Sequence, residues 1–184
     1  MDLTGKAELD GRQRMILGVL DHGSRALLAL RELAVKRSLT ILLTLIALFR
    51  CSGLPRRIRV DNEACFVSRR MRFALRLLGI ELQRIAPHCP WQNGRIERLF
   101  GTLKQQLDRV CIVSTQDLQR KLIEFRCWYN HVRPHQHLRG RTPAEAWEGS
   151  KKATGTPQRF CGWGGLHKSS EVAFIHEPIS FPTS

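Results

Sequence analysis

The chain has 184 residues, of which 42% are hydrophobic, enough for one domain of ordinary size with an apolar core. Its 30 Lys and Arg residues outnumber its 16 Asp and Glu residues, and the formal net charge is +14. Such an excess favours an anionic partner: nucleic acid first, whose phosphates bind Lys and Arg, and an anionic membrane surface second. A basic protein without a specific partner is the third alternative.

Several classes of protein are disfavoured by the cysteines and by the apolar runs. None of the six cysteines stands in C-x-x-C spacing, so neither a zinc ribbon nor a redox motif is supported. The residues after Met1 include Asp2 and Lys6 and do not form a secretory leader. The apolar run from Leu39 to Phe49 is too short to span a bilayer. We therefore expect a cytoplasmic protein with reduced thiols and no membrane partner.

Residues 1–35 have the pattern of strands. Met15 to Leu20 is a continuous apolar run, and Arg25 to Leu33 is a second one. Met1 to Thr4 has the character of the end of an earlier strand, with Gly5 to Gln13 as a polar hairpin connection. Three strands with short links predict an antiparallel meander.

From residue 38 onward helices and strands alternate, which favours parallel strands joined by crossover helices. The first helix is apolar on most sides, so we expect it to pack deeply, with Ser38 as its N-cap. The predicted elements are a helix at Ser38–Cys51, a strand at Arg57–Val60, a helix at Ser68–Leu78, a strand at Ile80–Ile85 and a helix at Gln92–Leu107.

The last of these helices carries one apolar stripe, made of Ile96, Leu99, Phe100, Leu103 and Leu107. Gly101 within it costs about 1 kcal/mol relative to Ala, which indicates close packing or the approach of a ligand.

Two more helices are expected before the composition changes. Thr115 is the predicted cap of a helix from Gln116 to His131, and a short helix begins with Pro143 after Thr142. After Gly149 no apolar period persists, so residues 150–184 are predicted to be a poorly ordered tail.

Two carboxylates stand at positions that suit metal binding. Asp61 follows a short strand, and Glu97, with 35 residues between them, falls in the first turns of a helix. In open α/β sheets, ligands gather beyond the carboxyl ends of strands. With a third carboxylate from the first strand, the set would hold two Mg²⁺ ions, which promote in-line displacement at phosphorus.

At these residues the sequence resembles the DDE transposases and integrases, a family that includes retroviral integrases and many bacterial insertion-sequence transposases. The family pattern is an Asp on the first strand, an Asp in a D-N-G-x-x-F context and a Glu in a P-x-N-G-x-x-E context. Asp61-Asn62 with Phe66 matches the second part, and the run P-W-Q-N-G-R-I-E from Pro90 to Glu97 matches the third. The run F-G-T-L-K from Phe100 is also typical of the family, and the run W-Y-N-H-V-R-P-H from Trp128 resembles the bacterial branch more than the retroviral one.

The first aspartate of the pattern has three candidates. Asp2, in D-L-T, matches the D-x-T context that the family places on its first strand, and it is our assignment. Asp21, before Ser24-Arg25, corresponds to an acidic residue that ends the second strand in the family and is usually not catalytic. Asp10 stands in a turn-like D-G, and both remain alternatives.

The resemblance implies a ribonuclease-H-like α/β fold, a five-stranded mixed sheet flanked by helices, over an N-terminally truncated core at residues 1–149. It implies DNA strand transfer in transposition or integration, with Asp2, Asp61 and Glu97 as catalytic residues and ligands of two Mg²⁺ or Mn²⁺ ions. The implied partners are transposon-end and target DNA, on which a homo-oligomer assembles. The implied location is the bacterial cytoplasm, at the nucleoid.

The sequence also departs from the family. The first strand lacks its first half, the upstream tryptophan and an N-terminal DNA-binding module are absent from this sequence, and Glu63 stands where the family has glycine. A non-catalytic DNA-binding remnant and a metal-dependent nuclease of the same fold are therefore the alternatives. The predicted DNA contacts, each with a solvated surface as the alternative, are Gln92, Asn93, Arg95 and Lys104. For the arginines of the helix at Ser68–Leu78, a solvated face and a DNA-binding track are equal alternatives.

Overall fold

The structure is a computed structural model that describes residues 1–7, 13–86, 89–151, 160–162 and 167–169. It divides into two compact units, one of Met1–Val19 and Leu28–Leu118 and one of Leu20–Leu27 and Gln119–Ser184. Most of the predicted tail, 150–184, lies outside the described residues. Within it, strand β6 (Phe160–Gly162) pairs antiparallel with β7 (His167–Ser169).

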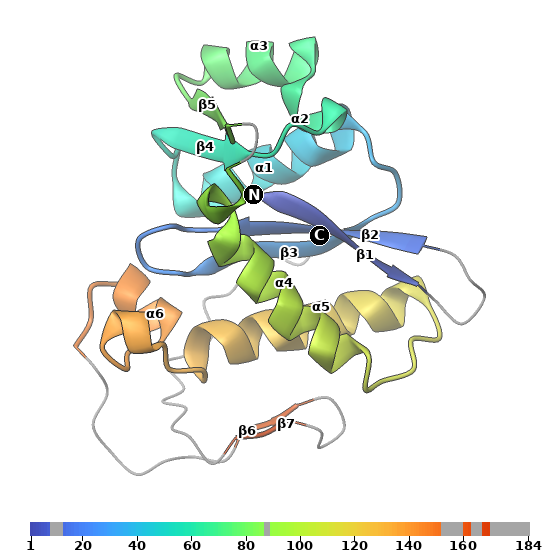
Figure 1. The fold of residues 1–184 in the computed structure, drawn as a ribbon, viewed down its shortest axis with the longest axis vertical. Helices are drawn as coiled ribbons and strands as arrows, with labels where there is room; N and C mark the ends of the chain where they lie inside the picture. The colour runs from blue at the N-terminus through green and yellow to red at the C-terminus, as the bar shows by residue number, and fades with distance from the viewer. Residues whose placement is uncertain (8–12, 87–88, 152–159, 163–166, 170–184) are drawn as a thin grey trace. The chain divides into compact units, whose positions relative to one another are not determined.

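A three-stranded sheet forms the base of the first unit (Figure 1). It contains β1 (Asp2–Ala7), β2 (Gln13–Leu20) and β3 (Leu27–Leu33) in that order. Strands β1 and β2 are antiparallel, and Asp2 lies opposite Gly18. The three predicted strands are thus present, but β1 continues past Thr4 to Ala7 because the polar residues Gly5 and Lys6 also pair with β2.

A second, two-stranded sheet pairs β4 (Arg57–Val60) in parallel with β5 (Glu81–Arg84), as the alternation of elements predicts. The single five-stranded sheet is not confirmed, because these strands form a sheet of their own. Near this sheet, the N-terminal amine of Met1, which directly precedes β1, donates a hydrogen bond to the carbonyl of Arg59 in β4 at 2.7 Å.

Helix α1 (Ser38–Ser52) packs on this unit through one stripe only. Ile41, Leu45 and Phe49 are buried in the same cluster as Leu17 of β2. The predicted deep packing is present along this stripe, whereas Leu39, Leu43 and Ile46 on the rest of the helix are exposed. The predicted cap is wrong: Arg37 precedes the first turn and makes no side-chain cap hydrogen bond.

Two helices connect β4 to β5. The sequence did not predict the first, α2 (Ala64–Val67), which is only one turn long. The second, α3 (Arg69–Leu77), begins after Ser68, whose hydroxyl accepts a hydrogen bond from the backbone nitrogen of Met71 at 3.2 Å. It ends near Gly79, whose φ of +69° suits a glycine at a helix end, close to the predicted end at Leu78.

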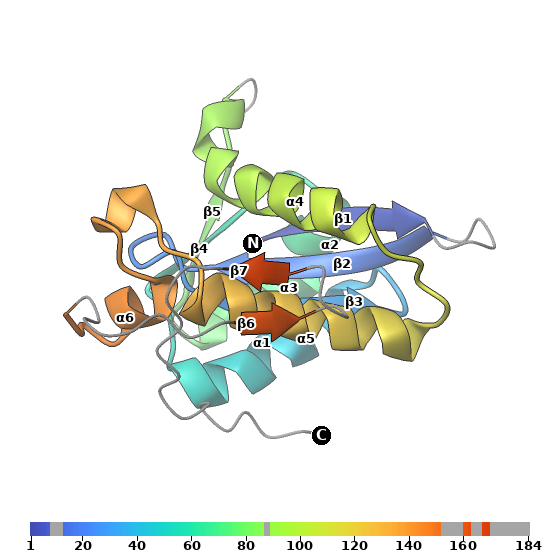
Figure 2. The same cartoon turned by 90° about the horizontal axis from the view of Figure 1, so that it is seen from below.

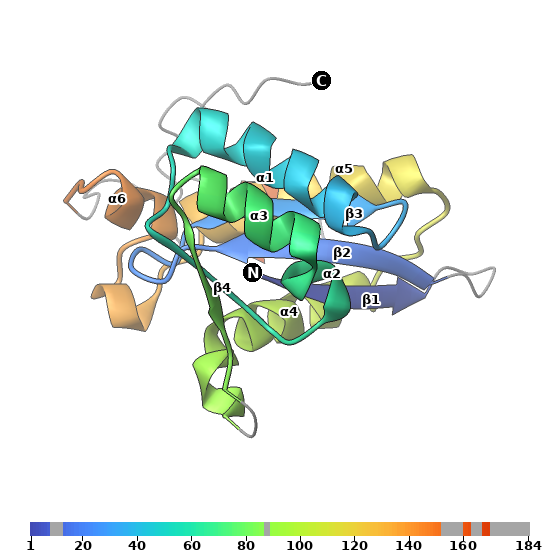
Figure 3. The same cartoon turned by 90° about the horizontal axis from the view of Figure 1, so that it is seen from above.

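Helix α4 (Gly94–Leu107) follows a short 3₁₀ turn, η1 (Pro90–Gln92), and lies on the opposite face of the three-stranded sheet from α1 (Figures 2 and 3). Its predicted apolar stripe is confirmed, since all five residues are buried. Gly101 is not a packing residue, because nothing lies within 4 Å of the position a Cβ would take there.

The glycine that allows close packing is Gly18 of β2. A Cβ at Gly18 would lie 2.8 Å from two ring carbons of Phe100 and 3.6 Å from Cδ1 of Ile96. Because successive residues of a strand face opposite sides, Leu17 packs toward α1 and Gly18 toward α4. Gly18 thus lets α4 approach the sheet directly opposite Asp2.

The second unit is mainly helical. Most of α5 (Thr115–His131) belongs to it, together with a 3₁₀ turn, η2 (Gln136–Leu138), and α6 (Pro143–Trp147). The side chain of Asn130 accepts a hydrogen bond from the backbone nitrogen of Leu27 at 2.8 Å and donates one to its carbonyl at 3.0 Å. The predicted cap of α6 is present as a reciprocal pair between Thr142 and Glu145.

Replacing Gly18 with Ala tests the approach of α4. The added methyl group overlaps the ring of Phe100, so we expect Gly18→Ala to lower the free energy of unfolding by about 1–3 kcal/mol. Urea denaturation of the full chain measures this. Phe100→Leu removes the ring and should recover part of the loss in the double variant. Equal losses from Gly18→Ala in the presence and absence of the ring would contradict the contact.

Candidate active site

Asp2 is fixed by two hydrogen bonds at the start of β1. Its Oδ1 accepts one from the backbone nitrogen of Leu3 at 2.7 Å, and its Oδ2 accepts one from Nδ2 of Asn93 at 2.8 Å. Asn93 directly precedes α4 but makes no cap hydrogen bond. Its amide thus reaches back to β1 and connects the helix that carries Glu97 to the first aspartate.

Asp61 follows β4 and lies beside Asp2. Its Oδ1 accepts a hydrogen bond from the backbone nitrogen of Glu63 at 3.1 Å. The pKa values of both Asp2 and Asp61 are raised, chiefly because partial burial desolvates the carboxylates. The negative charge of Asp2 raises the pKa of Asp61 further. The two carboxylates therefore repel each other, and a cation between them would relieve that repulsion.

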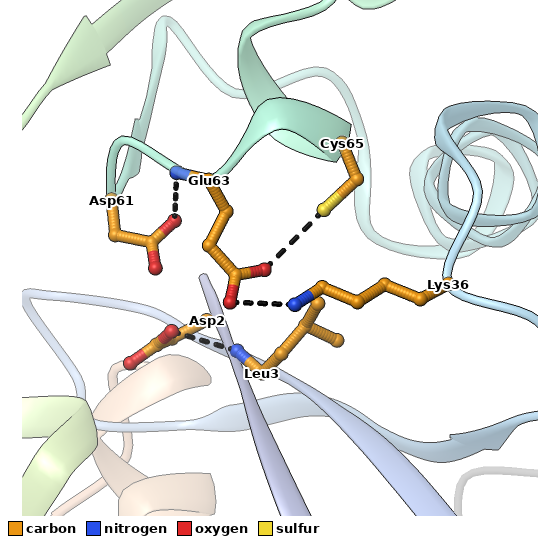
Figure 4. Close-up of polar contacts among 6 residues, drawn as sticks. All are labelled: Asp2, Leu3, Lys36, Asp61, Glu63 and Cys65. Carbon is orange, nitrogen blue, oxygen red and sulfur yellow. Dashed lines mark hydrogen bonds and ion pairs between the residues drawn. The ribbon is translucent and has the colours of Figure 1, made fainter.

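Glu63 brings a third carboxylate to this pair (Figure 4). Its charge contributes to the raised pKa values of Asp2 and Asp61. Its Oε1 accepts a hydrogen bond from Nζ of Lys36 at 2.8 Å, and its Oε2 accepts one from the thiol of Cys65 at 3.5 Å. Burial first, and then the contact with Glu63, raises the pKa of the Cys65 thiol to about 11, so this cysteine stays protonated.

Glu97 does not join the other two predicted ligands in this arrangement. It lies in the first turn of α4 and is exposed to solvent. In the part of the chain that the structure describes, no three His, Cys, Asp or Glu side chains are arranged to hold a metal ion. Two of the three predicted ligands are thus neighbours, and the third lies on the helix that Asn93 connects to them.

The donor set of Asp2 and Asp61 fits a hard divalent cation. Carboxylate oxygens are the ligands that Mg²⁺ prefers, and one or two of them suffice when substrate oxygens complete the shell. Burial raises the pKa of both groups because it penalises their charged forms, and a bound cation would offset that penalty. Glu97 as placed here does not add to this set, so the fit holds for the two aspartates.

The two alternatives to Asp2 as the first aspartate are Asp21 and Asp10, and the contacts of Asp21 indicate a structural role. Asp21 uses Oδ2 to accept hydrogen bonds from the backbone nitrogens of Gly23 and Ser24 and from the hydroxyl of Ser24, at 2.7–3.0 Å. Its carboxylate therefore closes a turn. Asp10 lies outside the described residues.

The predicted DNA contacts have varied surroundings. Gln92 holds the backbone before α4, since its Oε1 accepts a hydrogen bond from the nitrogen of Ala86 at 3.2 Å. Asn93 binds Asp2, as described above. Arg95 and Lys104 are exposed on α4.

The sequence did not predict the hydrogen bond from Asn93 to Asp2 or the ion pair between Lys36 and Glu63. The sequence does place Asn93 at the start of a helix, where its side chain can bind either the helix backbone or a residue elsewhere in the fold, here Asp2.

The comparisons with known proteins agree with this fold. The family model of the integrase core domain matches residues 78–143. An uncharacterized protein of Caenorhabditis elegans is 32% identical over 129 residues, which cover 67% of this chain. The chain spans only 10% of the length of that relative.

The described part of the chain contains no helix long and apolar enough to cross a membrane.

Solved integrase structures have the same fold. The catalytic core of BIV integrase matches with a TM-score of 0.62 at 19% identity, over 80% of this chain and 92% of its own. The HTLV-2 integrase core, solved with magnesium, gives 0.63 at 17% identity, over 79% and 92%. An intasome of simian T-cell lymphotropic virus gives 0.69 at 18% identity, over 92% and 64%. The resemblance to the integrase superfamily is confirmed, and the comparisons do not single out its bacterial insertion-sequence branch.

The hydrogen bond from Asn93 to Asp2 predicts a role in metal binding. Asn93→Ala removes the donor that orients Asp2, so we expect the affinity for Mn²⁺ to fall by about 10- to 100-fold. Calorimetric titration of the full chain with Mn²⁺ measures this. Gln105→Ala, an exposed change on the same helix, is the control and should leave the affinity unchanged. An unaltered affinity in Asn93→Ala would contradict the role.

The raised pKa of Asp61 predicts a gain of stability on its removal. A carboxyl with a raised pKa stabilises the folded state when protonated and costs stability as the pH rises through that pKa. Asp61→Asn should therefore raise Tm at pH 7 by about 1–3 °C, a small gain because solvent screens the partly exposed group. Below the ordinary value of 3.8 the difference should vanish. Calorimetry from pH 3 to 7 measures it, and a variant less stable than the wild type at pH 7 would contradict the repulsion.

Proposed function

We propose that this chain, whose residues 78–143 carry an integrase core domain, performs metal-dependent DNA strand transfer in transposition or integration. The observation that carries the proposal is the pair of desolvated carboxylates, Asp2 and Asp61, held beside each other at the ends of two strands. The match to integrase cores and the net charge of +14 support DNA as the substrate.

In this proposal each residue has a limited task. Asp2 and Asp61 hold a divalent cation, and Asn93 keeps the carboxylate of Asp2 oriented toward it. Bound divalent cations supply charge stabilisation at the attacking and leaving oxygens of a phosphodiester. Catalysis otherwise consists of positioning the DNA hydroxyl or water in line with the scissile bond. No covalent bond between protein and DNA is required.

Glu97 completes the site in this proposal. Two Mg²⁺ or Mn²⁺ ions need more oxygen ligands than Asp2 and Asp61 offer, and Glu97 is the carboxylate that the family pattern supplies. The solved HTLV-2 integrase core contains magnesium, which supports the choice of metal. Residues 1–149 form the catalytic core in this proposal, and the protein acts at the nucleoid in the cytoplasm.

The partners follow from the same reaction. Strand transfer joins transposon ends to a target, so Gln92 and Asn93 before α4, and the exposed Arg95 and Lys104 within it, are proposed to contact DNA. Solved relatives are described as dimeric and trimeric forms and as an intasome, which supports assembly of a homo-oligomer on DNA.

A joining assay with the full chain tests the function. Donor duplexes with randomised ends are incubated with a plasmid and Mg²⁺ or Mn²⁺, and joined products are recovered by sequencing. We expect joined products from the wild type and none above background from Asp2→Asn, Asp61→Asn or Glu97→Gln, because each change removes a ligand charge.

The control is Asp21→Asn, which alters a turn-closing carboxylate and should retain joining. Plasmid cleavage without joining would instead indicate a nuclease of the same fold. Salt-sensitive DNA binding without either reaction would indicate a non-catalytic remnant. Joining that survives Asp61→Asn would overturn the site.

A further inference from the structure

Away from the carboxylates, the first unit has a groove of about 690 Å³ between α3 and β5. Three arginines of α3 line it, at positions 69, 72 and 76, together with Phe73. This spacing places the four side chains on one face of the helix, while Met71 and Leu75 are buried on another. The groove is therefore built from the exposed face of a helix that is well anchored in the core.

The arginines of this groove are not neutralised. All three are exposed, and within the described residues none of them forms an ion pair. The acidic residue in the lining, Glu81, lies 3.7 Å from Arg57, measured from Oε2 to Nε. The groove thus keeps an excess of positive charge, and guanidinium groups bind phosphate oxygens in a bidentate geometry.

Phe73 gives the groove a second property. Its side chain is 66% exposed, an unusual position for a phenylalanine between arginines, and Ile80 and Leu82 add apolar surface to the lining. A basic groove with an exposed aromatic ring is the combination that binds single-stranded nucleic acid, because phosphates bind the cations and an unstacked base stacks on the ring. A duplex offers phosphates but no free base face.

We propose that the groove formed by Arg69, Arg72, Phe73 and Arg76 binds a single-stranded segment of DNA. The proposal rests on the proposed function only in taking DNA as the ligand, and it adds a contact surface separate from Asp2, Asp61 and α4. Three phosphates of the strand pair with the arginines, and one base stacks on Phe73.

Binding of a fluorescent thymidine oligonucleotide by the full chain, in EDTA and over a range of salt, tests this. We expect the triple change Arg69→Gln, Arg72→Gln and Arg76→Gln to weaken binding and to reduce the salt slope by about 2, since three single-strand phosphate contacts are lost. Phe73→Ala should weaken binding by roughly 5- to 150-fold with an unchanged salt slope.

The matched control is Arg31→Gln, Arg50→Gln and Arg109→Gln, exposed arginines outside the groove that carry the same total charge. This control variant should keep most of the affinity for the oligonucleotide and most of the salt dependence of binding. Circular dichroism checks that α3 is retained, which we expect because Gln forms helices nearly as well as Arg. Equal behaviour of the two triple variants would overturn the proposal. So would unaltered binding by Phe73→Ala, or preference for a duplex or anionic vesicles over the oligonucleotide.

The measurement without metal separates this proposal from the catalytic one. If the groove variants bind the oligonucleotide normally while the wild type joins DNA, the groove fails and strand transfer stands. If the wild type joins nothing but the groove variants lose binding, strand transfer fails and the groove stands.

Discussion

The partial burial of Asp2 and Asp61 beside each other is the constraint on which the candidate site depends. Both carboxylates are partly desolvated, and each is oriented by hydrogen bonds to the nearby chain. Their strands belong to different sheets, and the amine of Met1, just before β1, donates a hydrogen bond to the carbonyl of Arg59 in β4. The protein therefore brings two partly desolvated carboxylates together, an arrangement that costs stability and that a bound cation would relieve.

The other constraint is the approach of α4 to the sheet. Gly18 lies opposite Asp2 in β2, and the ring of Phe100 occupies the space that a side chain at position 18 would need. The same helix begins after Asn93, which donates to Asp2. One end of α4 is thus tied to the first aspartate, and its middle is packed on the strand beside it. These two contacts determine where Glu97, near the start of α4, lies relative to Asp2.

The sequence predicts elements that local periodicity determines and misses features that depend on distant residues. The stripe of α4, the strand before Asp61 and the cap of α6 follow from local spacing, and the structure confirms them. The apolar residues of α1 do not reveal that only one stripe is buried, because burial depends on what packs against the helix. The division into two sheets depends on which distant strands pair, and no local pattern encodes that. The position of Asn93 at a helix start could be predicted, but its side chain binds Asp2 and not the helix backbone because β1 brings Asp2 within reach.

The departure at Glu63 shows why such distant contacts matter for function. Its φ of −61° and ψ of 139° are accessible to any L residue, so the glycine of the family pattern is not required by the backbone here. Glutamate at this position adds a negative charge beside Asp2 and Asp61, and Lys36, from the segment before α1, adds a positive one at 2.8 Å. Asp2, Asp61, Glu63 and Lys36 together therefore carry the same net charge as the two aspartates alone. The compensation is not complete at each carboxylate, because the charge of Glu63 raises the pKa of both aspartates, and Lys36 lowers that of Asp61 by a smaller amount.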